Sequence, residues 1–194
     1  GAGKTTCVDI ALFALALDAQ RPKAQRWCPR RIAMVVDRRV VVDQVAERGR
    51  KLAAALADPK GPTVVSEVAR ALRSLCANSD GQLEPVGVFT LRGGVPKDDG
   101  WARSPDQPLI LASTVDQLGS RLLVQGYGVS RSMRPVHAGL IGNDTLVLLD
   151  EVHLSQPFAE TLQALPTLRK HSQSKRLVPA RFQVAFLSAT PGQQ

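Results

Sequence analysis

The chain is poor in cysteine and contains no long uncharged apolar run. Cys7, Cys28 and Cys76 stand alone, without C-x-x-C spacing, which argues against a disulfide framework and against a zinc site. The longest apolar stretch, residues 8–17, includes Asp9 and is too short to span a membrane. We therefore expect a protein of the reducing cytoplasm that has no membrane partner.

Aromatic residues are also scarce, at 4% of the chain, and they are not interleaved with lysines. Surfaces that stack on bases combine exposed aromatic rings with basic side chains. Trp27, Trp101 and Tyr127 could stack on bases, but with so few aromatic residues we expect them to pack in the core or in loops.

The chain is rich in positive charge and has enough apolar residues for a core. Its 194 residues, 44% of them hydrophobic, suit one compact domain. The formal net charge of +8 and the sequence pI near 10.0 predict attraction to polyanions. Because the arginines are scattered, two interpretations stay open. Nucleic acid is the favoured partner, and an arginine-rich solvated surface is the alternative.

The apolar pattern predicts an α/β fold with a mainly parallel sheet flanked by helices. Helical spacing covers residues 5–17, 40–57, 62–77 and 115–124, and apolar runs typical of buried strands cover 32–36, 86–91, 109–112, 145–149 and 182–187. Residues 126–143 are glycine-rich and basic, so we expect a loop there. A mostly polar helix and a basic connection at 169–176 should follow the fourth strand. Functional residues are expected at the carboxyl ends of the strands.

The first residues resemble the end of a phosphate-binding loop, G-x-x-x-x-G-K-[ST]. In such a loop, backbone N–H groups and the lysine face the β- and γ-phosphates of a nucleotide, and the threonine hydroxyl reaches Mg²⁺. We therefore expect ATP to be bound by Ala2, Gly3, Lys4, Thr5 and Thr6. The first glycine of the pattern would precede Gly1 by two positions, so we expect both termini to be breaks in a longer protein.

An acidic pair, Asp150 and Glu151, follows the apolar run 145–149. In ATPases with this loop the first acid helps to hold the metal, so Thr5 and Asp150 are the predicted Mg²⁺ ligands. Glu151 would orient or deprotonate the attacking water, and Lys4 would neutralise phosphate charge. Each motif alone is common by chance, because strand ends often carry surface acids. Their order and domain-scale separation favour a nucleotide site.

Five segments in a fixed order resemble the motifs of superfamily 2 helicases: Asp37-Arg38-Arg39, Arg92-Gly93-Gly94, Ser113-Thr114-Val115-Asp116-Gln117-Leu118, Asp150-Glu151-Val152-His153 and Ser188-Ala189-Thr190. This resemblance implies a RecA-like domain of the P-loop NTPase class. Residues 1–194 would be the first such domain of a DExH-type helicase, truncated at both ends.

A narrower resemblance is to the helicase part of the CRISPR-associated helicase-nuclease of type I systems, in its type I-U (I-G) branch. It rests on further segments such as Gly126-Tyr127-Gly128-Val129-Ser130 and residues 133–139. This family unwinds and degrades invading DNA that an RNA-guided surveillance complex has marked. The resemblance therefore implies two partners, single-stranded DNA and an RNA-guided complex.

The helicase resemblance also assigns roles outside the nucleotide site. The phosphate backbone of DNA would be contacted by Arg38, Arg39, Gly93, Gly94 and Thr114, and ATP state would be coupled to motion by His153, Ser188 and Thr190. The physical chemistry agrees, because a threonine at a helix start and an arginine at a strand end can both bind phosphates. The plainer alternatives are that Thr114 caps its helix, that the arginines are solvated and that Ser188 ends a strand.

The second RecA-like domain and the nuclease domain of that family are not in this sequence. His137 and His171 are isolated, and no His-Asp pair has metal-ligand spacing. Since the second domain supplies the arginines that stabilise the transition state, we expect this segment alone to hydrolyse ATP very slowly. Three alternatives remain: an RNA helicase, a restriction or repair translocase, and a non-catalytic nucleotide-binding remnant.

Overall fold

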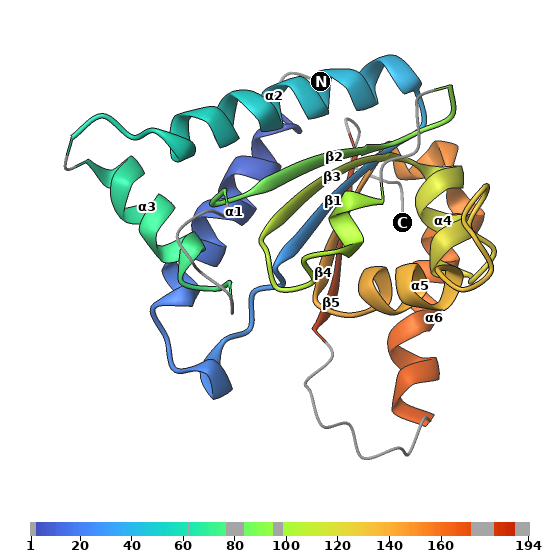
Figure 1. Cartoon of the computed structure of the whole chain (residues 1–194). Coiled ribbons are helices and arrows are strands. Elements are labelled where there is room, and N and C mark those ends of the chain that lie inside the picture. The colour runs from blue at the N-terminus through green and yellow to red at the C-terminus, as the bar shows by residue number, and fades with distance from the viewer. Residues whose placement is uncertain (1–2, 62, 77–83, 95–98, 172–180, 189–194) are drawn as a thin grey trace.

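Five parallel strands form one sheet at the centre of the protein (Figure 1). The computed structural model describes residues 3–61, 63–76, 84–94, 99–171 and 181–188. The strands are β1 (Arg31–Val36), β2 (Gly87–Leu91), β3 (Leu109–Thr114), β4 (Thr145–Asp150) and β5 (Phe182–Leu187), in the spatial order β2-β3-β1-β4-β5. This arrangement confirms the predicted α/β class and the parallel sheet. It is consistent with RecA-like and Rossmann-type domains.

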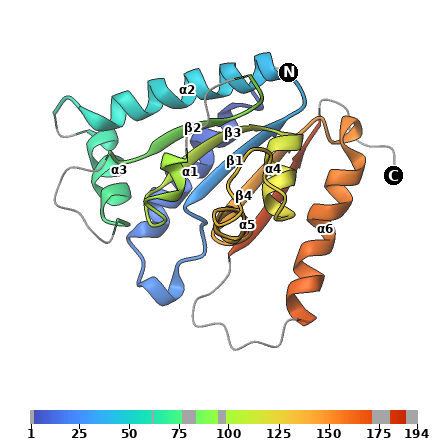
Figure 2. The same ribbon diagram turned by 45° about the vertical axis from the view of Figure 1, so that its right-hand side comes forward.

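Helices cover both faces of the sheet (Figures 1 and 2). One face carries α1 (Thr6–Ala19), α2 (Arg39–Ala57) and α3 (Val64–Arg73), and the other carries α4 (Val115–Leu122), α5 (Arg134–Gly142) and α6 (Gln156–His171). Three short 3₁₀ turns, η1 (Lys23–Gln25), η2 (Gly100–Ala102) and η3 (Val152–Leu154), complete the described elements. Each face thus has its own apolar core.

The position of β1 in the middle of the sheet explains why residues 32–36 are all apolar. Ile32 and Met34 pack into the core beneath α1 and α2, whereas Ala33 and Val35 face the core beneath α4 and α6. All six residues of β1 are buried. Because both faces of a parallel sheet are covered, its inner strands show no alternation of apolar and polar residues.

The prediction of a loop over 126–143 is wrong for its second half, where residues 134–142 form α5. Pro135 stands in the first turn, where a missing N–H costs nothing. His137 and Ile141, one helical turn apart, are fully buried. The side of the helix at Gly139 is open, since nothing lies within 4 Å of the position that a Cβ atom would take. Tertiary packing of one helix face therefore overrides the unfavourable propensity of glycine.

The helix predicted over 62–77 is also shorter than expected, because α3 covers only Val64–Arg73. Thr63 begins it with a capping box, in which its hydroxyl accepts from the Ser66 N–H and the Ser66 hydroxyl accepts from the Thr63 N–H. Residues 62 and 77 lie outside the described ranges.

A buried arginine joins three segments at the amino end of the sheet. The guanidinium of Arg31 is 4% exposed and donates to the carbonyl oxygens of Leu140 at 3.0 Å, Pro105 at 2.7 Å and Asn143 at 3.1 Å. Burial lowers the pKa of this group. The three backbone acceptors compensate for the lost hydration of the charge.

A second buried polar cluster lies between η2, α4 and α5. The rings of Trp101 and His137 are 4.6 Å apart between centroids, and neither ring nitrogen of His137 has a hydrogen-bond partner in the described chain. Asp99 approaches His137 Nε2 at 3.6 Å, and the side chain of Arg121 is also buried. The pKa of His137 is lowered, mainly by burial, with Arg121 adding to the effect and Asp99 opposing it.

We predict that Arg31→Met lowers the free energy of unfolding by about 3 kcal/mol, because three carbonyl groups lose their donor and little water can replace it. The matched control is Arg50→Met. Arg50 is exposed and has one weak contact, to Thr90 Oγ1 at 3.5 Å, so its loss should change stability by less than about 0.5 kcal/mol. Urea unfolding monitored by circular dichroism measures both. Equal losses would contradict the proposed role of Arg31.

We also predict that the protein loses stability as the pH falls below about 6.5, the ordinary pKa of histidine. The unfolded chain takes up a proton at His137 in this range, whereas the folded chain does not, because the folded pKa is lower. The contribution is at most about 1.4 kcal/mol per pH unit. Urea unfolding at pH 7.0 and 5.5 measures this contribution, and His137→Phe should remove it from the pH dependence of the free energy of unfolding. The same pH dependence in the variant and the wild type would contradict the role of His137.

Candidate nucleotide site

The topological switch point of the sheet lies between the carboxyl ends of β1 and β4. β2 and β3 lie on one side of β1, while β4 and β5 lie on the other. In open α/β sheets, ligands bind in the crevice outside such a point. The register places Val36 beside Thr114 and Asp150 beside Leu187, so the strands end at one level.

The predicted phosphate-binding residues lie above this crevice. Gly3 has a φ of +114°, a conformation that favours glycine. A turn leads from Gly3 into α1. In it the Thr6 N–H donates to the Gly3 carbonyl and the Cys7 N–H to the Lys4 carbonyl, each at 3.0 Å. Thr5 stands at the N-cap but its side chain makes no capping hydrogen bond. Its hydroxyl is therefore available to a ligand. Ala2 lies outside the described residues.

Lys4 contacts both members of the acidic pair. Its ammonium group lies 2.8 Å from Asp150 Oδ1 and forms a second ion pair with Glu151 Oε1, 147 positions away along the chain. The Lys4 and Asp150 side chains are about 15% exposed. The hydrogen bonds that Lys4 donates to Asp150 and then to Glu151 raise the pKa of Lys4, and the bond to Glu151 lowers the pKa of that carboxyl group. These shifts favour the charged forms of Lys4 and Glu151.

Glu151 adopts a conformation that is rare for a residue with a side chain. Its φ of 48° and ψ of 57° are left-handed, which costs roughly 1–3 kcal/mol and is found most often at functional sites. Two hydrogen bonds hold this turn, from Glu151 N–H to Asp150 Oδ1 at 2.9 Å and from Leu154 N–H to the Glu151 carbonyl at 2.8 Å. The turn directs both carboxylates of the pair toward Lys4. His153 Nδ1 lies 3.5 Å from Glu151 Oε2.

A pocket of about 510 Å³ contains these groups. Its lining residues are Lys4, Thr5, Val36, Asp37, Arg38, Val41, Gln44, Asp150, Glu151, His153 and Leu154. The pocket thus brings together the predicted phosphate, metal, water-activating and coupling residues. Arg38, which was predicted to contact nucleic acid, lines the same pocket as Lys4.

Gln44 and Asp37 line this pocket too, although the sequence did not assign either to nucleotide binding. Their positions in the sequence, at the end of a predicted strand and the start of the helix after it, could have pointed to them. Asp37 directly follows β1, and Gln44 lies in the first turns of α2. Only the spatial order of the strands, with β1 beside β4, places this segment next to the acidic pair.

The remaining predicted nucleic-acid contacts gather at the end of β2. Arg92 is fixed by Asp43, whose Oδ1 accepts from its Nε at 2.7 Å, and its Nη1 donates to the Gly93 carbonyl at 3.1 Å. A Cβ atom at Gly93 would approach Arg39 Nη2 to 3.3 Å, and Gly94 has a φ of +81°. The two glycines therefore allow the Arg39 guanidinium to lie against the turn that Arg92 begins.

Thr114 lies between these two groups, at the end of β3. It occupies the N-cap position of α4, but its side chain makes no capping hydrogen bond and the residue is 8% exposed. The ends of β2 and β4 are three strand spacings apart, about 14 Å. The arginine group and the acidic pair thus share one edge of the sheet without touching.

The predicted coupling segment follows β5. Leu187 is in register with Asp150, so Ser188 continues the chain beside the acidic pair. Ser188 is exposed. Thr190 lies outside the described residues.

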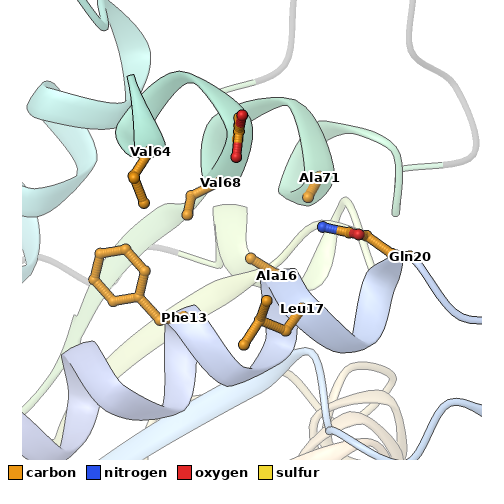
Figure 3. Close-up of a pocket in the computed structure, with 8 residues that line it drawn as sticks. Phe13, Ala16, Leu17, Gln20, Val64, Val68 and Ala71 are labelled. Carbon is orange, nitrogen blue, oxygen red and sulfur yellow. The ribbon is translucent and has the colours of Figure 1, made fainter. Parts of the chain in front are cut away.

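A second pocket has different chemistry. It lies between α1 and α3, has a volume of about 180 Å³ and is lined mainly by apolar side chains, among them Phe13, Leu17, Val64 and Val68 (Figure 3). Gln20 and Glu67 are its polar residues. With one carboxylate and no cation in its lining, it lacks the groups that bind phosphates.

Comparison with known proteins gives no match: no protein-family model fits the chain, and no curated protein matches it significantly. Within the described ranges, no three His, Cys, Asp or Glu side chains come together as a metal-ligating group. No helix in the described part of the chain has the length and apolar character of a transmembrane span.

Proposed function

We propose that this chain is the ATP-binding domain of an ATP-dependent DNA helicase. The observation that carries the proposal is the ion pair of Lys4 with Asp150 and Glu151 in a pocket at the carboxyl edge of the sheet. A helix N-terminus and an ammonium group favour phosphates, while a carboxylate next to a hydroxyl favours a divalent cation.

The side chains at the site fit Mg²⁺ bound together with a nucleotide. Thr5 offers a hydroxyl that makes no capping hydrogen bond, and Asp150 offers a carboxylate in the same pocket. Mg²⁺ is usually held by one or two protein oxygens plus phosphates and water, not by a cage of protein ligands. The absence of a three-residue metal cluster in the described chain agrees with this mode. When bound, Mg²⁺ would neutralise the phosphate charge.

Residues of the chain would bind the phosphates, orient the attacking water and couple the site to nucleic acid. Lys4 would leave the carboxylates and donate to the β- and γ-phosphates, helped by the N–H groups at the start of α1. Glu151 would accept a hydrogen bond from the attacking water and orient it. His153 beside Glu151 would pass the state of the site to the nucleic-acid contacts.

DNA would bind at the same edge of the sheet. Arg39 and Arg92 lie at the end of β2 with the glycine turn between them, a cationic site that suits a phosphate backbone and reads no sequence. The motif resemblance makes the CRISPR helicase-nuclease of type I systems the proposed full-length protein. An RNA-guided surveillance complex would be its partner and the cytoplasm its location.

We predict that Lys4→Ala weakens the binding of Mg²⁺-ATP at least tenfold, because a charge-assisted contact to phosphate contributes about 1.5–3 kcal/mol. Lys51→Ala is the matched control, since the Lys51 side chain is 76% exposed and pairs with the nearby Glu47 at 2.7 Å, on the surface of α2. Glu151→Gln should bind Mg²⁺-ATP as tightly as the wild type or more tightly, because Lys4 then has one fewer competing carboxylate. Isothermal titration calorimetry measures all three.

Two outcomes of this titration would contradict the nucleotide site. One is unchanged affinity in Lys4→Ala, and the other is an equal loss in Lys51→Ala. Rapid ATP turnover by the wild-type chain alone would contradict a separate expectation, namely that a second domain supplies the transition-state arginines.

A further inference from the structure

The segment between Asp116 and Asp144 has an unusual charge pattern. Its 27 residues, 117–143, contain Arg121, Arg131 and Arg134 but no aspartate or glutamate. Arg131 is exposed and forms no ion pair within the described chain, and Arg134 is half-buried. Because Arg121 is buried at 3%, Arg131 and Arg134 provide the positive charge that this segment presents, and no acid within the segment neutralises it.

The same segment exposes large apolar side chains. Leu123 is 56% exposed, Val124 49%, Tyr127 60% and Val136 42%. Of the aromatic residues expected in the core or in loops, Trp101 is buried at 1%, whereas Trp27 and Tyr127 lie in loops with exposed side chains, Trp27 at 57%. Most of an aromatic ring on a basic surface is thus open to a ligand.

Tyr127 stands on a loop with a fixed base, the 123–133 loop. The Ser120 carbonyl accepts from the N–H groups of Gln125 at 2.8 Å and Gly126 at 2.9 Å. A Cβ atom at Gly126 would meet Val129 at 3.0 Å, and Gly126 and Gly128 both have positive φ, of 52° and 67°. Val129 is buried at 5% and anchors the loop. Tyr127 is therefore the exposed tip of an ordered turn.

Val124 adds backbone strain to this loop. Its φ of 63° is a genuine outlier for a β-branched residue, and such strain costs roughly 1–3 kcal/mol. Since its side chain is half exposed, burial offsets only part of the cost. Strain that packing does not explain is found most often at binding sites.

We propose that Tyr127 is a base-stacking residue for single-stranded DNA and that Arg131 and Arg134, a few positions further along the chain, contact the phosphates. Single-strand-binding surfaces combine an aromatic ring with positive charge, because every base has a π-face and every nucleotide a phosphate. The lack of acids in 117–143 favours a polyanion over a protein that carries charges of both signs. This inference rests on the proposed function, to which it adds a second contact with the bases of the DNA.

The position of the 123–133 loop suits a strand that leaves the edge of the sheet. α4 starts at the carboxyl end of β3 and has eight residues, a length of about 12 Å. The loop follows α4 and stands on the outside of the α4–α5 layer in both views (Figures 1 and 2). A single strand of several nucleotides can cover this distance, since comparable sites hold about 4–16 nucleotides.

The test uses the whole chain and two fluorescent oligonucleotides of equal length, a thymidine homopolymer and the same backbone without bases. Tyr127→Ala should bind the thymidine strand about tenfold more weakly in fluorescence anisotropy, and the abasic strand as well as the wild type does. Tyr127→Phe should restore binding. Trp27→Ala should behave as the wild type, because it removes a similarly exposed ring that precedes the amino end of β1. Because Tyr127 is exposed, its loss should leave the circular dichroism spectrum unchanged.

The outcomes separate this inference from the proposed function. If Tyr127→Ala binds both strands like the wild type while Arg39→Ala weakens both, the stacking role is wrong and the DNA-binding function stands; the exposed surface would then serve a protein partner. If Tyr127→Ala weakens both strands equally, the ring contacts no base and the inference fails. If the wild-type chain binds neither strand, the DNA part of the proposed function fails as well, whatever the titration with Mg²⁺-ATP gives.

Discussion

The ammonium group of Lys4 joins the first turn of the chain to the end of its fourth strand. Two carboxylates hold this partly buried charge, one at 2.8 Å. An ammonium group in such a place needs partners, because removing it from water without them is costly. This requirement fixes the start of α1 over the crevice between β1 and β4, and it brings the Thr5 hydroxyl near Asp150 in one pocket. The candidate site therefore depends on the anionic partners of Lys4. These are carboxylates in the structure, and we propose that they are phosphates in a nucleotide complex.

The sheet arranges the remaining polar groups in order along its carboxyl edge. The arginine and glycine turn lies at β2, Thr114 at β3, Arg38 at β1 and the acidic pair at β4, with Ser188 following β5. Each step between neighbouring strands is about 4.8 Å. Because β1 and β3 are fully buried and β4 mostly so, the ends of these inner strands are fixed relative to one another. The buried Thr114 lies between the arginine turn and the acidic pair along this edge.

The fold was largely predictable from the sequence, because a parallel sheet covered on both faces leaves continuous apolar runs such as 32–36 and 145–149. The acidic pair and the candidate phosphate-binding residues stand out as local motifs in the sequence. Three features were not. Helix α5 exists because the buried faces of His137 and Ile141 outweigh its glycines, Arg38 reaches the Lys4 pocket through the order of the strands, and Tyr127 is exposed because no neighbouring element covers its loop. Each depends on contacts between distant segments, which periodicity and composition do not contain.

The proposed nucleotide site requires Lys4 to exchange carboxylates for phosphates when ATP binds. A crystal structure of the chain with Mg²⁺ and a non-hydrolysable ATP analogue would show whether this exchange takes place. We expect Lys4 Nζ about 3 Å from a β- or γ-phosphate oxygen and away from Glu151, with Thr5 and Asp150 facing the metal. A nucleotide bound elsewhere, or Lys4 still between Asp150 and Glu151 with the analogue present, would show that the site is not the one proposed.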